Sequence, residues 1–132
     1  VSTLTKDEQD SALKEKLLSK DNIKIFESSI PEIQEIYQMS DLYFFPVKED
    51  GHCIDVPLSC LEAASCDLPV ITTDFGEMKE FTGKPGFYRI NDFDENGLNG
   101  LIEYVLRSEP YSTRKSVLQY DWDNCISDFS VT

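Results

Sequence analysis

The chain has 132 residues, 40% hydrophobic and 28% charged, which is the composition of one modest soluble globular domain. Its net charge of −13 argues against a nucleic-acid partner and against docking on anionic lipid, because both are bound through clusters of lysine and arginine. No apolar run approaches a membrane span, no secretory signal opens the chain, and the four cysteines form no C-x-x-C pair, which predicts a cytoplasmic protein with free thiols and no metal site.

The first part of the chain predicts two helices and two strands. Residues 5–19 begin with a threonine cap and carry a narrow leucine stripe, as in a surface helix. IKIF, residues 23–26, is a short strand candidate, and a second helix is predicted over residues 29–39. LYFFPV, residues 42–47, is continuously apolar, which indicates a strand buried on both faces.

The rest of the chain continues the alternation. Two further strands are expected, one over residues 68–74 (LPVITTD) and one over residues 87–90 (FYRI). The remaining helical segments are predicted over residues 57–65, 77–83, 91–108 and 111–130, and the last has a candidate break near Asp121.

This alternation indicates an α/β fold: a Rossmann-like, three-layer α/β/α arrangement with a small, mainly parallel sheet of about four strands. Residues 1–132 show no internal repeat or linker, so one domain is expected. In such sheets ligands bind at the carboxyl ends of the strands. The loops expected to carry function are therefore residues 47–57 and 74–80.

Glu62 stands out because it lies between Leu61 and Ala63 in an otherwise apolar helix, where a carboxylate needs a partner. Ser59 and Glu62 have the spacing of a capping box, in which Glu62 would bind only a backbone N–H group. Alternatively, Glu62 lies near the start of a helix at the ligand site. There a carboxylate accepts hydrogen bonds from sugar hydroxyls, and N–H groups bind a diphosphate. Both interpretations are open at this point.

The segments SDLYFFPV and IDVPLSCLEAASCDLPVITTDFGEMKE, in this order, resemble the donor-sugar half of the family 4 glycosyltransferases. The matching features are Pro46, the Leu61-Glu62-Ala63 helix, Pro69-Val70-Ile71, and Gly76 with Glu80. PEIQEIYQMSDLYFFP upstream and YDWDNCISDF downstream extend the resemblance to roughly residues 20–129.

The resemblance implies the carboxyl-terminal, donor-binding domain of a retaining enzyme with two Rossmann-like domains (the GT-B type). Such an enzyme transfers a sugar from a nucleotide-sugar, such as a UDP- or GDP-sugar, to an acceptor, and it needs no cofactor or metal. Glu62 would accept hydrogen bonds from the ribose hydroxyls. The donor-binding candidates are Glu62, Val56, Pro57, Leu58, Ser59, Gly76, Glu80 and His52, although Pro57 has no N–H to donate and His52 also fits a solvated loop.

Two positions in the loop depart from the family's pattern. The family has a second glutamate eight positions before the first, and Ile54 stands there in this chain. Asp55, Asp50 and Glu49 are the candidates for replacing that acid, and of these Asp55 and Glu49 are the candidate catalytic residues. Val47 stands where the family has a serine after the proline that ends the strand.

The resemblance also implies a partial domain. Nothing before Asp21 resembles the two strands, glycine-rich turn and basic residues with which the family's donor domain opens, and the acceptor-binding domain is missing. The isolated chain is therefore expected to be inactive. Without the two strands, residues 42–46 would form an exposed edge, which either residues 23–26 pair with or another chain covers by self-association.

Two non-enzymatic functions also fit parts of the sequence. A flavodoxin-like regulatory module, such as a phospho-receiver, has the same rhythm of strands, but it needs an aspartate where Pro46 stands and an acidic pair that this chain lacks. A non-catalytic interaction fragment of a larger glycosyltransferase fits Ile54 and the short amino-terminal part.

Overall fold

Two separate units make up the chain, residues 1–33 and residues 34–132. A computed structural model describes residues 11–47, 53–91, 93–108, 112–121 and 123–124. In the first unit, helix α1 (Ser11–Leu18) buries none of its side chains. Lys14 donates a hydrogen bond to Glu27 in an exposed ion pair. Such exposed pairs stabilise a protein only slightly.

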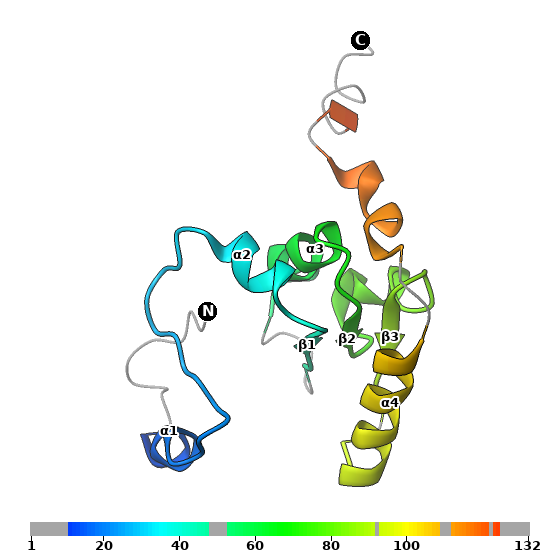
Figure 1. Ribbon diagram of the computed structural model, residues 1–132. Helices are drawn as coiled ribbons and strands as arrows, with labels where there is room; N and C mark the ends of the chain where they lie inside the picture. Colours follow the sequence, from blue (N-terminus) through cyan, green and yellow to red (C-terminus); the bar gives the residue numbers. More distant parts are fainter. Residues whose placement is uncertain (1–10, 48–52, 92, 109–111, 122, 125–132) are drawn as a thin grey trace. The chain divides into compact units, whose positions relative to one another are not determined.

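Three short parallel strands form the sheet of the second unit, in the order β1 (Tyr43–Phe45), β2 (Val70–Thr72) and β3 (Phe87–Arg89) (Figure 1). Tyr43 is opposite Val70, and Val70 is opposite Phe87. Each strand lies inside a predicted one, so the parallel α/β sheet is confirmed.

The prediction of a strand over residues 23–26 is wrong. These residues adopt no strand conformation, and Phe26 is 55% exposed. A short segment needs a hydrogen-bonded neighbour to become a strand, and the described part of the first unit supplies none. The expected pairing of residues 23–26 with residues 42–46 is therefore wrong as well. The sheet has three strands instead of about four, and β1 lies at its edge.

Helix α3 (Leu58–Ser65) covers one face of the sheet (Figure 1). Side chains alternate along a strand, so one face carries Tyr43, Phe45, Val70, Thr72 and Phe87. The residues that α3 buries are small: Cys60, Ala63 and Ala64 are all 0% exposed. Their size lets the helix backbone approach the strands closely. Burial also raises the pKa of the Cys60 thiol to about 12, as expected of a core cysteine.

Helix α4 (Glu95–Arg107) covers the opposite face and completes the third layer (Figure 1). The carboxylate of Asp94 caps it by accepting a hydrogen bond from the Gly97 N–H at 2.7 Å. Val105 packs with Ile71 and Ile90 in a buried cluster. The helix predicted over residues 91–108 is therefore confirmed over Glu95–Arg107.

The other predicted helices are shorter than expected. Residues 29–39 contain α2 (Ile33–Gln38), and residues 77–83 overlap the 3₁₀ helix η2 (Gly76–Glu80). The α-helix predicted over residues 111–130 is wrong for residues 113–120, whereas residues 123–124 are helical and the predicted break near Asp121 is confirmed. Two 3₁₀ helices, η3 (Thr113–Ser116) and η4 (Leu118–Tyr120), stand in its place, and the second ends at Asp121 in extended backbone.

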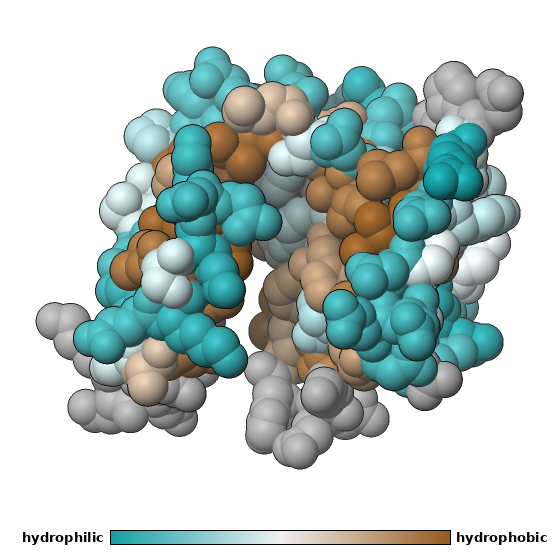
Figure 2. Space-filling view, turned by 60° about the horizontal axis from the view of Figure 1, so that its bottom comes forward, coloured by the Kyte–Doolittle hydropathy of each residue, from teal (hydrophilic) through white to brown (hydrophobic). Residues whose placement is uncertain are grey.

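Hydrophobic side chains reach the surface between hydrophilic ones on the face shown in Figure 2. Four of the large apolar residues are more than 60% exposed: Met39, Ile54, Leu58 and Tyr104. Ile54 and Leu58 flank the start of α3, which makes this end of the helix unusually apolar. None of the helices in the described ranges has the length and hydrophobicity required to cross a membrane.

Candidate functional site

The loops that follow β1 and β2 meet at the carboxyl edge of the sheet. Asp55, from the first loop, packs directly against Gly76 of the second: a Cβ added to Gly76 would lie 2.7 Å from the Asp55 Cα and 2.8 Å from its Oδ1. Gly76 also has a φ of +46°, a conformation that favours glycine. Two residues predicted separately from the sequence are therefore adjacent.

Threonine hydroxyls join the beginnings of the same two loops. The Val47 N–H donates to Thr73 Oγ1 at 3.0 Å, and Thr73 Oγ1 donates to the Val47 carbonyl at 2.7 Å. Thr72 Oγ1 donates to the Phe45 carbonyl at 2.9 Å. These bonds hold the ends of β1 and β2 together where their backbone pairing stops.

Glu62 lies in the second turn of α3, and its side chain is exposed. Its Oε2 accepts a hydrogen bond from the Tyr37 hydroxyl at 3.2 Å. The helix starts at Leu58 with Pro57 as its N-cap, so Ser59 is not the cap. The capping-box interpretation of Ser59 and Glu62 is therefore wrong, and the partner of Glu62 comes from α2, 25 positions earlier in the chain.

Two tyrosines surround this carboxylate. Tyr37 is 7% exposed, and its ring meets the Tyr43 ring edge to face, with centroids 5.8 Å apart. Burial, and then the charge of Glu62, raise the pKa of Tyr37. Burial also raises the pKa of Tyr43, although the nearby Ser59 hydroxyl acts in the opposite direction. We call Tyr37, Tyr43, Ser59 and Glu62 the tyrosine–glutamate cluster.

The start of α3 has no side-chain cap among the described residues, and its first turn contains no acid. The first N–H groups of a helix have no partner within it, so the carbonyls of α3 do not bind the amides of Leu58 and Ser59. Among the predicted neighbours, Pro57 is buried, Val56 is half-buried and Leu58 is 67% exposed.

Asp74, which follows β2, joins the ends of β2 and β3, and it was not among the site residues predicted from the sequence. Its Oδ2 accepts a hydrogen bond from Arg89 at 2.8 Å, and its Oδ1 accepts one from Thr82 at 2.6 Å. The Thr82 hydrogen bond, followed by Arg89, lowers the pKa of Asp74. A signal was present, because Asp74 and Arg89 come at the ends of consecutive strands, and these ends are neighbours in a parallel sheet.

The remaining predicted site residues are dispersed or lie outside the description. Glu80 is exposed at the end of η2. Glu49 and His52 lie outside the described residues. Within the part of the chain that the structure describes, no group of three His, Cys, Asp or Glu side chains is arranged to hold a metal ion.

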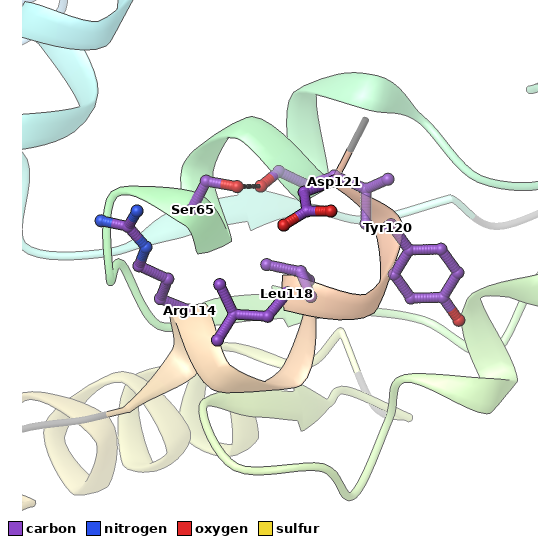
Figure 3. A pocket seen from close by; sticks show the side chains of 7 residues that line it. Ser65, Arg114, Leu118, Tyr120 and Asp121 are labelled. Atoms are coloured by element: carbon purple, nitrogen blue, oxygen red, sulfur yellow. Dashed lines mark hydrogen bonds between the residues drawn. The ribbon is translucent and has the colours of Figure 1, made fainter. Parts of the chain in front are cut away.

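A cavity of about 170 Å³ lies between α3 and the 3₁₀ helices η3 and η4, away from the loops that follow β1 and β2 (Figure 3). It is lined by Leu61, Ser65, Arg114, Val117, Leu118, Tyr120 and Asp121. The Ser65 hydroxyl is used within the helix, where it donates to the Leu61 carbonyl. In Figure 3 the Arg114 guanidinium and the Tyr120 ring point away from each other, so the polar groups do not converge on one point.

A family model described as "Glycosyl transferases group 1" matches residues 4–108. Comparison with curated proteins and with solved structures gave no match. The family match supports the resemblance between residues 20 and 108 and extends it to residue 4, ahead of Asp21. It does not include residues 109–129, where YDWDNCISDF was compared with the family's terminal helix. Because the match spans most of the sequence, the chain belongs to the group 1 glycosyl transferases.

Proposed function

We propose that this chain is the donor-binding part of a retaining glycosyltransferase of family 4, and that it binds a nucleotide-sugar at the carboxyl edge of its sheet. The observation that carries the proposal is the family match over residues 4–108. The exposed Glu62 carboxylate of α3 supports it. A ribose presents two neutral hydroxyl donors, and an ionised carboxylate is the strongest acceptor that a side chain offers them.

The start of α3 is the proposed site of the diphosphate. Backbone N–H groups at the amino end of a helix point toward an anion, and the helix dipole favours negative charge there. The amides of Val56, Leu58 and Ser59 would serve this role, and Pro57 contributes none. With no side-chain cap, α3 leaves these donors free for a ligand. The sugar would then lie toward Asp55 and the Gly76 turn.

The proposed reaction exchanges one bond to the anomeric carbon for another. The bond from this carbon to the diphosphate oxygen breaks, and the nucleoside diphosphate leaves with the electron pair. The acceptor oxygen bonds to the same face of the sugar and passes its proton to the departing diphosphate. Asp55 and Glu49 are the candidate acids beside the sugar. We expect the positioning of the acceptor and the exclusion of water to depend on a further, acceptor-binding domain.

The proposal is tested by calorimetric titration of UDP, GDP and their sugar conjugates into the wild-type chain and the Glu62→Gln variant. Loss of a charged acceptor should weaken binding about ten- to one-hundredfold, the range for hydrogen bonds to a charged group. Glu103→Gln is the matched control, because Glu103 is an exposed glutamate of α4 on the other face of the sheet. Equal affinities of the wild type and Glu62→Gln would contradict the proposed role of Glu62.

A transfer assay tests the reaction itself. We expect the 132-residue chain to bind the donor with little turnover when nucleotide-sugars and acceptors are supplied together and the products are followed by mass spectrometry. Sustained transfer by this chain alone would show that these residues also position the acceptor.

A further inference from the structure

Tyr37 is a buried residue whose hydroxyl contacts the exposed side chain of Glu62. The residue is 7% exposed, whereas the carboxylate to which it donates belongs to an exposed side chain. A tyrosine usually finds a partner for its hydroxyl when it is buried. Here the partner is Glu62, the residue that the proposed function places on the ribose.

The environment of Tyr37 fixes the position of its hydroxyl. Its ring stands edge to face against Tyr43, with the ring planes at 84°. Tyr43 in turn stacks on Phe45, with ring centroids 6.2 Å apart. Ring packing thus joins Tyr37 of α2 to β1, and the hydrogen bond of Tyr37 with Glu62 joins α2 to α3.

Glu62 has no such packing of its own. It is exposed on α3, and Tyr37 is the hydrogen-bond partner that the structure shows for it in the described part of the chain. A glutamate has several rotatable bonds, and holding it in one geometry costs conformational entropy. An outside group that holds one carboxylate oxygen lowers this cost for the ligand that binds the other oxygen.

We propose that Tyr37 is a positioning residue, whose hydroxyl holds Oε2 of Glu62 so that Oε1 is directed at a ribose hydroxyl of the bound nucleotide. This inference rests on the proposed function. Because burial and Glu62 both raise the pKa of Tyr37, the hydroxyl stays protonated and remains a donor through neutral and moderately alkaline pH. The role requires the hydroxyl alone, since a phenylalanine ring would fill the same space.

The test compares UDP and GDP with their dideoxyribose analogues, which lack both ribose hydroxyls, on four proteins: wild type, Tyr37→Phe, Glu62→Gln and the double variant. Tyr37→Phe should weaken binding of the ribonucleotides about three- to tenfold, the effect of one hydrogen bond, and leave the analogues unchanged. In the double variant the effect of Tyr37→Phe should disappear, because Tyr37 acts only through Glu62.

Tyr104→Phe is the matched control, because Tyr104 lies on α4 and is 63% exposed. Circular dichroism melts establish that each variant is folded. Equal weakening of the ribonucleotides and their analogues by Tyr37→Phe would indicate a merely structural role and overturn the inference, and so would additive effects in the double variant.

The two proposals fail differently. If Glu62→Gln weakens ribonucleotide binding and Tyr37→Phe does not, only the positioning role is lost. If the wild-type chain binds no nucleotide, or distinguishes no ribonucleotide from its analogue, the proposed function fails and takes the positioning role with it.

Discussion

The two helices that cover the sheet are built differently. Helix α4 has an aspartate cap at its start and an i,i+4 ion pair between Glu103 and Arg107, and its apolar residues pack on the core. Helix α3 has neither a side-chain cap nor a basic residue in its last turn. It buries the small residues Cys60, Ala63 and Ala64. Local devices therefore stabilise α4, whereas α3 depends on its fit against the sheet.

This difference separates stability from function. An uncapped helix start leaves N–H donors for a ligand, and small buried residues bring that start close to the ends of the strands. One α3 side chain also bonds to a distant part of the chain, because Glu62 accepts from Tyr37, whereas Ser65 bonds within the helix. Substitutions on the α3 side of the sheet should therefore have larger and less local effects than equivalent substitutions in α4.

The largest effect is expected from Gly86→Ala, beside β3. A Cβ at Gly86 would lie 1.9 Å from Oγ1 of the buried Thr113, in the segment that packs on α3. The φ of Gly86, +81°, adds strain for any L side chain. We expect a loss of about 2–4 kcal/mol in the free energy of unfolding, from overpacking and strain together. Urea denaturation would measure it.

Gly100→Ala in α4 is the control for that substitution. No atom lies within 4 Å of a Cβ added to Gly100, so alanine should raise the free energy of unfolding by about 0.5–1 kcal/mol through its better helix propensity. If both substitutions changed stability equally, the proposed contrast between the two sides of the sheet would not hold.

A smaller effect is expected at the start of α4. Asp94→Ala removes the hydrogen bond to the Gly97 N–H and should lower the free energy of unfolding by about 1 kcal/mol. Asp94→Asn keeps an acceptor at the cap and should recover most of this loss, which chemical denaturation can show. Nucleotide binding should be unaffected by both variants, because the cap belongs to the helix away from the candidate site. Loss of binding in Asp94→Ala with the fold intact would contradict this separation.

Sequence patterns predicted the strands well because burial on both faces leaves a strong signal. LYFFPV and LPVITTD are continuous apolar runs, and β1 and β2 lie within them. IKIF is largely apolar too, but the described part of the first unit supplies no neighbouring strand, and composition does not reveal a missing neighbour. The α-helix predicted over residues 111–130 differs from the structure for another reason: apolar spacing does not distinguish an α-helix from consecutive 3₁₀ turns.

The candidate site was predictable in its location but not in its contacts. The rule for parallel sheets identified the two loops, and Asp55 and Gly76 lie together there. The partner of Glu62 was not predictable, because Tyr37 reads as one more apolar position of its helix. Its hydroxyl reaches Glu62 only through the packing of α2 beside α3, a long-range arrangement without a local sequence signal.

The smallest predicted effect concerns the pH dependence of Asp74. Hydrogen bonding by Thr82 and Arg89 holds its pKa below the usual value of 3.8. The ionised form of Asp74 therefore has a lower free energy in the folded chain than in the unfolded one. Its contribution to the free energy of unfolding is fully present above the unfolded pKa and is lost as pH falls through the folded pKa. Asp74→Asn should lower the free energy of unfolding at about pH 7 by less than about 1 kcal/mol, because the pair with Arg89 is partly exposed. The difference from wild type should shrink toward about pH 2, as urea titrations at a series of pH values would show.

Glu103→Gln is the control from α4. The side chains of its ion pair, Glu103 and Arg107, are 66% and 81% exposed, so the loss of stability should be smaller still. A difference between Asp74→Asn and wild type that stays constant from neutral to acid pH would mean that the Asp74 charge contributes nothing at this edge of the sheet.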